Sequence, residues 1–237
     1  DMLFSLLSPA DLIAYSKTCR ASRYSIKSFY RRAFRIEKTL RRFFAPDEIQ
    51  PFRELQAMTG MIISGSTVLE FFDRTEYADS DLDLYVEHKR REPVVLWLES
   101  IGYKFIPRPS SGPPTLEIML LDDLMTHSDG ISPPTVSEYR DAMLVLDFKR
   151  AGSQRIQLIT STSSPFELVL HFHSTCVMNI ITHDKAYSVF PRATFEERRS
   201  LVHVKDTDST ALTKYEERGW QLIQDIKSED PEVYSMF

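Results

Sequence analysis

Two aspartates spaced two residues apart are the side chains in this sequence best suited to chemistry. Asp81 and Asp83 alternate with apolar residues, and this period of two predicts a strand over residues 82–86. On a strand, both carboxylates point to the same side and repel each other. A divalent cation such as Mg²⁺ or Mn²⁺ relieves that repulsion. Asp81 and Asp83 are therefore predicted to be metal ligands and catalytic residues.

A short loop upstream of these aspartates is suited to binding phosphate. Residues 61–63 form an apolar run that predicts a buried strand, and Gly65 and Ser66 follow it before a predicted helix start. Gly65 would let the backbone approach a triphosphate, whose oxygens the Ser66 hydroxyl and the amides at the helix start, including that of Thr67, would bind. We reject a P-loop here, because the segment has strand-forming residues at its centre and no lysine.

Taken together, residues 61–86 resemble the core signature of the nucleotidyltransferase superfamily: a strand, Gly-Ser, a short helix and an Asp-x-Asp strand. The resemblance implies an α/β or α+β fold, with a mixed sheet flanked by helices. It also implies a nucleoside triphosphate ligand, with ATP expected, and Mg²⁺ or Mn²⁺ as cofactor. The implied reaction transfers a nucleoside monophosphate to a hydroxyl of a protein, an RNA or a small molecule. Fourteen residues separate Ser66 from Asp81, near or slightly beyond the upper end of the usual spacing.

The superfamily carries a third carboxylate on a later strand, and this sequence departs from that pattern. Residues 143–149 and 155–160 predict a hairpin, whose second strand places Gln157 at the expected acid position. A neutral amide is a poorer metal ligand and no general base, so Gln157 is kept as a nucleotide-binding candidate. Asp147 on the partner strand could act as the third catalytic acid if its side chain faces the same way. Two interpretations stay open, an active transferase and a catalytically inactive recognition module.

Two basic-aromatic segments are further candidates for nucleotide contacts. Lys185 and Tyr187 lie after the apolar segment 177–182, and Lys214 to Trp220 combine basic and aromatic residues. In each segment a cation would contact phosphate and an aromatic ring would stack on the base. Lys185 and Tyr187 are the pair that we predict to contact the nucleotide.

The chain is expected to divide into three parts: a helical segment 1–45, a nucleotidyltransferase-like core 46–182 and a helical extension 183–237 packed on that core. In the first part, residues 6–12 and 16–20 resemble the second half of an F-box, the helical module that docks onto a Skp adaptor of ubiquitin ligases. The combination resembles an arrangement in uncharacterised fungal proteins. A Skp-type partner for residues 1–45 is therefore implied by the resemblance, and it adds an adaptor role to the open alternatives.

Charge and composition limit the classes of partner. Residues 1–45 hold ten Lys or Arg and three Asp or Glu, a net charge of +7, so the remainder carries −12 of the total of −5. The sequence has two cysteines and no apolar run near the roughly 18 residues that span a bilayer. These features predict no membrane partner and an intracellular location, in the cytoplasm or the nucleus.

Overall fold

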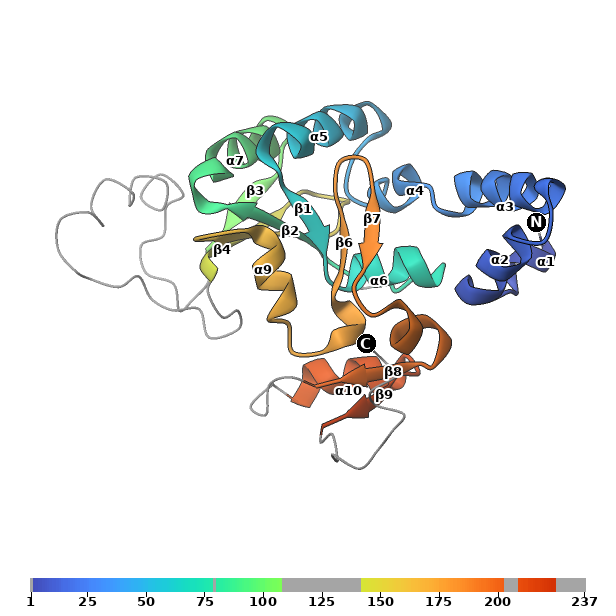
Figure 1. Ribbon diagram of the computed structural model, residues 1–237. Helices are drawn as coiled ribbons and strands as arrows, with labels where there is room; N and C mark the ends of the chain where they lie inside the picture. Colours follow the sequence, from blue (N-terminus) through green and yellow to red (C-terminus); the bar gives the residue numbers. More distant parts are fainter. Residues whose placement is uncertain (1, 79, 108–141, 203–208, 225–237) are drawn as a thin grey trace.

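A seven-stranded mixed sheet forms the centre of the computed structural model, which describes residues 2–78, 80–107, 142–202 and 209–224 (Figure 1). The strand order is β3-β4-β5-β2-β1-β6-β7, in which β2 and β5 run parallel and the other neighbours antiparallel. The bounds are β1 Ile62–Ser64, β2 Leu82–Glu87, β3 Lys104–Ile106, β4 Ala142–Lys149, β5 Ile156–Ser161, β6 Asn179–Ile181 and β7 Ala186–Ser188. The mixed sheet flanked by helices that the sequence predicts is confirmed.

Helices precede the sheet and cover both of its faces. Their bounds are α1 Met2–Ser5, α2 Pro9–Ser16, α3 Arg20–Ala33, α4 Ile36–Leu40, α5 Pro46–Thr59, α6 Ser66–Asp73, α7 Arg91–Ser100, α9 Pro165–Leu170 and α10 Ser209–Glu217. Short 3₁₀ turns occupy His88–Arg90 and Thr175–Val177, and a π-helical turn occupies Arg192–Glu196.

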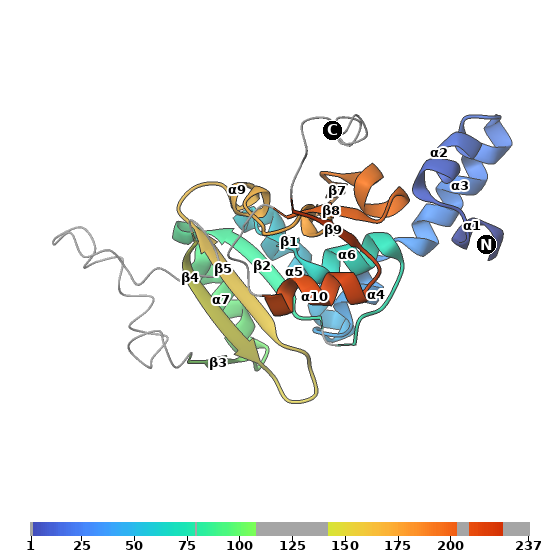
Figure 2. The same cartoon turned by 90° about the horizontal axis from the view of Figure 1, so that it is seen from below.

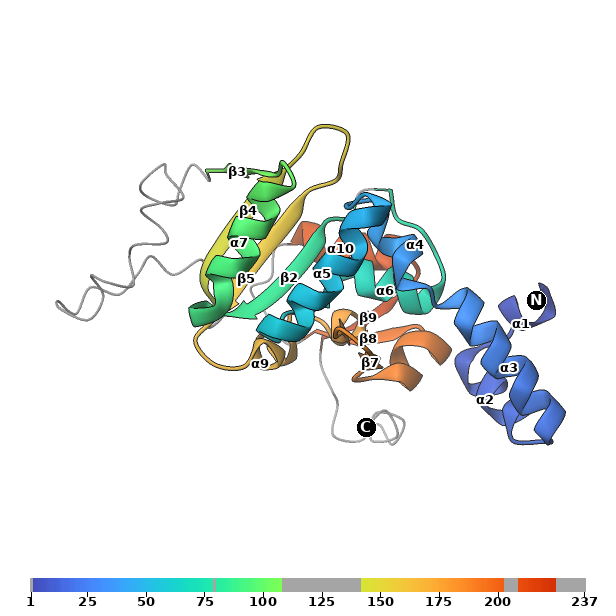
Figure 3. The same ribbon diagram turned by 90° about the horizontal axis from the view of Figure 1, so that it is seen from above.

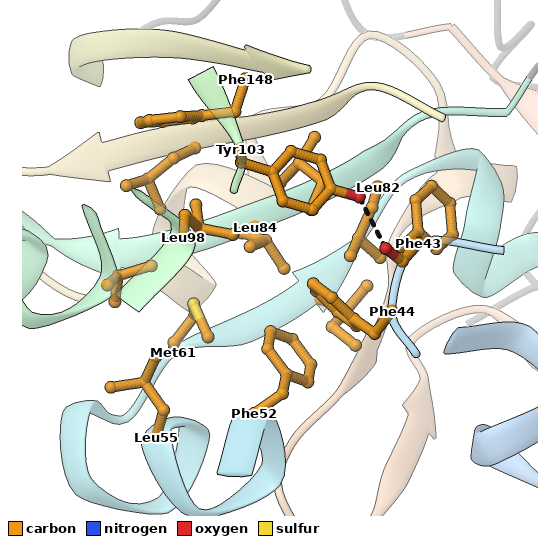
Figure 4. Packing of buried hydrophobic residues seen from close by; sticks show 14 of the residues in the cluster. Phe43, Phe44, Phe52, Leu55, Met61, Leu82, Leu84, Leu98, Tyr103 and Phe148 are labelled. Carbon is orange, nitrogen blue, oxygen red and sulfur yellow. Dashed lines mark hydrogen bonds between the residues drawn. The ribbon is translucent and has the colours of Figure 1, made fainter. Parts of the chain in front are cut away.

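One face of the sheet packs against α5 and α7, which lie side by side over it in Figure 3. The alternation in β2 sends Leu82 and Leu84 into this layer, together with Phe148 of β4 (Figure 4). The Tyr103 hydroxyl donates a hydrogen bond of 2.7 Å to the carbonyl oxygen of Phe43, which satisfies a polar group inside this core. Because these residues fill one face, Asp83 must point to the other.

The opposite face packs against α9, α10 and the residues around Trp220 that follow α10 (Figure 2). Tyr85 lies two residues after Asp83 on β2 and therefore points to the same face, where it is buried with Tyr215 of α10. The Trp220 indole N–H donates to the carbonyl oxygen of Thr194 at 2.9 Å, which links the chain after α10 to the π-helical turn. This arrangement brings α10 over the face that carries the Asp83 side chain.

The N-terminal helices α1, α2 and α3 project to one side of the sheet (Figure 1) and have a small core of their own around Leu12, Ile26 and Phe29. Arg74, which directly follows α6, donates to the carbonyl oxygens of Phe4 and Leu7 and so ties this unit to the body. The helical nature expected for residues 1–45 is observed.

The expected division at residue 182 differs from the structure in two respects. First, β7 belongs to the central sheet, pairing with β6, so the sheet extends past residue 182 to Ser188. Second, the C-terminal part is not wholly helical, because β8 Arg199–Leu201 and β9 Gln221–Ile223 pair in parallel around α10. These three-residue strands are too short to show a reliable period of two, whereas α10 gave a helical pattern.

Candidate functional site

The sheet brings four polar residues of four neighbouring strands into one row, which we call the polar row. Ser64 pairs with Asp83, Asp83 with Gln157, and Gln157 with Asp147. Residues opposite each other in adjacent strands present their side chains on the same face. The row thus lies on the side of α10, at the start of β2.

Gly65 places the backbone directly against the carboxylate of Asp83. Its φ of 75° and ψ of −154° belong to a region that is essentially restricted to glycine. A methyl group at this position would overlap with Oδ2 of Asp83. The Gly65 to Asp83 contact is therefore the point where the Gly-Ser loop and the Asp-x-Asp strand meet.

Helix α6, which follows Gly65, contacts the residue that directly precedes β2. Ser66 and Thr67 are the first residues of α6 and both are buried. The Thr67 hydroxyl donates a 2.6 Å hydrogen bond to the carbonyl oxygen of Asp81. Its side chain therefore positions Asp81, and a nucleotide contact by Thr67 would come from its backbone amide, one of the groups without a partner inside the helix.

The carboxylate of Asp81 is held by Arg155, which directly precedes β5. Nε and Nη2 of Arg155 both donate to Oδ2 of Asp81, the former at 3.0 Å. The Arg155 side chain is 43% exposed and that of Asp81 is 30% exposed, so solvent screens the pair. Exposed ion pairs of this kind contribute about 0–1 kcal/mol to stability, and the pair is accordingly easy to open.

Asp147 faces the same way as Gln157, which was the condition for its proposed role. The Gln157 amide Nε2 donates to Oδ1 of Asp147 at 3.0 Å, and Nη1 of Arg155 lies 3.9 Å from the same oxygen. Both side chains are buried. Asp147 therefore adds a third carboxylate to those of Asp81 and Asp83, one strand farther from Asp83 than the expected position.

Electrostatics in the row favour a cation beside Asp83. Burial and then the negative charge of Asp81 raise the pKa of Asp83 to about 7, although Lys214 and Arg155 act in the opposite direction. Burial, with a contribution from Arg218, lowers the pKa of Lys214, whereas Asp83 and Asp81 raise it. Lys214 of α10 is thus the charged group that the C-terminal segment brings to the polar row.

The donor set fits Mg²⁺ or Mn²⁺ shared with a phosphate ligand. Across the described residues, no group of three or more His, Cys, Asp and Glu side chains could hold a metal ion alone. Mg²⁺, however, takes one or two carboxylates and completes its coordination with waters and substrate phosphates. Asp81 and Asp83, whose charges repel each other on one side of one strand, offer that number of carboxylates. The residues do not fit a structural metal centre.

Lys185 and Tyr187 are not brought to the polar row. Lys185 lies in the turn between β6 and β7, where its Nζ is 2.7 Å from Oδ2 of Asp184. Tyr187 is on the edge strand β7, three strands from β2 in the sheet order. Because β6 runs antiparallel to β1, this turn lies at the end of β1 opposite to Gly65. The two residues therefore take no part in the site described here.

Arg155 is the site residue that sequence reasoning missed. Arg155 follows the hairpin turn and belongs to no motif. Because 74 residues separate it from Asp81 in the sequence, no local pattern predicts the contact. The signal that could have found it is its position two residues before Gln157. On a strand this spacing puts both side chains on one face.

Comparison with known proteins gives fold-level similarity without a family. No protein-family model matches the sequence, and no curated protein matches it. The similar solved structures include a CCA-adding enzyme in complex with CTP, with a TM-score of 0.49 and 13% identity, and a CCA-adding enzyme in an apo form, with a TM-score of 0.45 and 14% identity. The similarity covers 78% and 79% of this chain and 42% of each enzyme chain. This chain therefore spans less than half the length of those enzymes.

Within the described parts of the chain, no helix combines the length and the apolar character needed to cross a bilayer.

Proposed function

We propose that the polar row and the Gly65 loop bind the triphosphate of a nucleoside triphosphate, with ATP as the expected nucleotide. The observation that carries this proposal is the contact between the Gly65 backbone and the Asp83 carboxylate, beside the N-terminus of α6. Only glycine leaves room there, and a helix N-terminus favours phosphate. The Ser66 hydroxyl and the amides of Ser66 and Thr67 supply hydrogen-bond donors to the phosphate oxygens.

Asp81 and Asp83 are the residues that would hold Mg²⁺ or Mn²⁺ in this proposal. When bound, the cation neutralises charge on the phosphate oxygens during transfer. Lys214 adds a positive charge from α10, next to the same carboxylates. The buried side chains of Ser64, Asp147 and Gln157 would exclude water from one side of the bound phosphates and strengthen these interactions.

In the active form of the proposal, a hydroxyl of a protein, an RNA or a small molecule attacks the α-phosphorus. An oxygen–phosphorus bond forms, the bond to the bridging oxygen breaks, and pyrophosphate leaves with its electron pair. Asp147 is the carboxylate proposed to accept the hydroxyl proton, and Gln157 orients it through the 3.0 Å hydrogen bond. The alternative is a recognition module that binds the nucleotide and transfers nothing.

Nucleotide binding and transfer are tested with the full chain. Each of the four ribonucleoside triphosphates is titrated with Mg²⁺ present by calorimetry, beside Asp83→Asn, which keeps the shape of the side chain against Gly65. We expect at least about tenfold weaker binding in this variant, a loss of about 1.4 kcal/mol. Glu87→Gln, at the other end of β2, is the matched control and should bind normally.

Label transfer from α-labelled nucleotides separates the two forms of the proposal. Binding with transfer supports the enzyme, and binding without transfer supports the recognition module. Absence of binding for all four nucleotides contradicts both.

A second candidate function is docking of a Skp-type adaptor by the N-terminal helices. The observation that favours it is an apolar surface on the projecting unit: Met2, Leu3 and Leu6 have exposed fractions of 82%, 78% and 79%. Exposed apolar residues grouped together mark interaction surfaces. Leu3→Glu combined with Leu6→Glu should abolish co-purification with a purified Skp-type adaptor, whereas Lys17→Glu on the same unit should not. Failure of the unaltered chain to bind the adaptor would exclude this function.

A further inference from the structure

Arg155 lies beside the polar row, with its guanidinium against the carboxylates of Asp81 and Asp147. Among the described residues, the hydrogen bonds of its side chain all go to Asp81, and its third nitrogen lies 3.9 Å from Asp147. Both of these hydrogen bonds go to Oδ2 of Asp81, so a metal ion bound through either oxygen of this carboxylate would lie close to the guanidinium. The two cations would also repel each other at such a short separation.

We propose that Arg155 competes with the divalent cation for Asp81: it holds the carboxylate in the metal-free protein and turns to the triphosphate once the metal binds. The second half of this inference rests on the proposed function, and the first half does not. Arg155 is thus a positioning residue for Asp81 before metal binding and a phosphate-binding residue after it.

The side chain of Arg155 is free to make this movement while its backbone stays fixed. Its carbonyl oxygen accepts a 3.1 Å hydrogen bond from the amide of Leu82, which locks the register of β5 against β2. Its side chain, by contrast, is 43% exposed and bound at one carboxylate. The strand therefore serves as a fixed base from which the guanidinium swings.

Arg150 shows what an immobile arginine looks like in the same hairpin. Its guanidinium donates to both carboxylate oxygens of Glu48 and to the carbonyl oxygens of Ile101 and Phe43, with 21% of the side chain exposed. Partners on three separate elements fix it in one orientation. Arg155 has no such set among the described residues, which distinguishes a movable arginine from a structural one.

The chemistry of the guanidinium suits the second state. Its planar set of donors matches two phosphate oxygens as well as it matches a carboxylate. When Arg155 leaves Asp81, the metal compensates the negative charge of the carboxylates. Arg155 then compensates the negative charge of the phosphates. The movement couples the two ligands, so each would strengthen binding of the other.

The first test measures Mn²⁺ alone, by electron paramagnetic resonance, on the full chain without nucleotide. Arg155→Ala should bind Mn²⁺ about threefold to tenfold more tightly than the unaltered chain, because Asp81 is no longer engaged. Arg90→Ala is the matched control: Arg90 pairs with Glu87 on the same strand, with exposed fractions of 49% and 31% against 43% and 30% for the Arg155 pair. It should leave the affinity for Mn²⁺ at Asp81 unchanged.

The second test measures nucleotide binding at saturating Mn²⁺. Arg155→Ala should bind the nucleotide about tenfold more weakly although it binds the metal more tightly. Arg155→Lys keeps the charge and loses the planar donors. Its affinity for the nucleotide should therefore lie between those of the unaltered chain and Arg155→Ala. This opposite response to metal and nucleotide is the signature of an arginine that changes partners, and a purely structural role would not produce it.

The outcomes separate this inference from the proposed function. An Arg155→Ala variant that folds normally and binds Mn²⁺ no more tightly overturns the competition, even when nucleotide binding is normal and the proposed function stands. If Arg155→Ala binds Mn²⁺ more tightly but no variant binds nucleotide, the competition for Asp81 is upheld. The proposed movement of Arg155 from Asp81 to the triphosphate is then overturned. Thermal unfolding of each variant shows whether it is folded before these affinities are compared.

Discussion

Gly65 is the backbone position at which the site tolerates no side chain. Its positive φ and the overlap of a methyl group with Asp83 are two separate obstacles to any other residue. Gly152, in the turn between β4 and β5, has a φ of 76° and open space where its Cβ would be. Both glycines thus have a positive φ, and the contact with Asp83 is added at Gly65.

We predict that Gly65→Ala costs clearly more stability than Gly152→Ala and also removes nucleotide binding. Backbone strain from the positive φ costs about 1–3 kcal/mol at each position, and displacement of the Asp83 carboxylate adds to it only at Gly65. Urea unfolding of both variants measures the difference, and calorimetry measures the binding. Equal losses of stability with nucleotide binding intact would contradict the role of the Gly65 contact.

At the scale of the elements, the ion pair of Glu48 and Arg150 connects a helix to a strand that carries part of the polar row. It joins the start of α5 to the end of the β4 strand through two hydrogen bonds, 2.7 and 3.0 Å long. The hydrogen bond from Arg150 lowers the pKa of Glu48. A carboxyl whose pKa is lower in the folded chain stabilises it at pH values above the unfolded-state pKa, about 4.3 for glutamate.

We predict that Glu48→Gln lowers the free energy of unfolding by about 1.5–3 kcal/mol at pH 7. The difference from the unaltered chain should stay constant down to about pH 5 and shrink as the pH falls through 4.3 and then through the lower folded-state pKa. Urea unfolding across this pH range measures it. Glu54→Gln, an exposed acid on the same helix, is the control and should change little at any pH. A difference independent of pH would show that the charge of Glu48 is not responsible.

Across the chain, the elements near the motifs could be predicted from sequence, whereas their partners could not. The strand at 82–86, the hairpin and the helix that ends before Gly102 follow from local periodicity and turn residues. Lys185 and Tyr187 were selected by residue type alone, and the sheet order puts them at its edge. Arg155 was overlooked because its role depends on the pairing of β2 with β5.

Residue order was enough to predict the local geometry of the site, namely the shared face of Asp81 and Asp83 and a glycine loop before a helix. Backbone alternation and the conformational freedom of glycine are properties of neighbouring residues, so no tertiary contact is needed to infer them. The tertiary structure alone decided that Gly65 touches Asp83, that Arg155 holds Asp81 and that Lys214 comes from α10. Those contacts depend on strand register and helix packing, which are fixed by burial of apolar faces far apart in the chain.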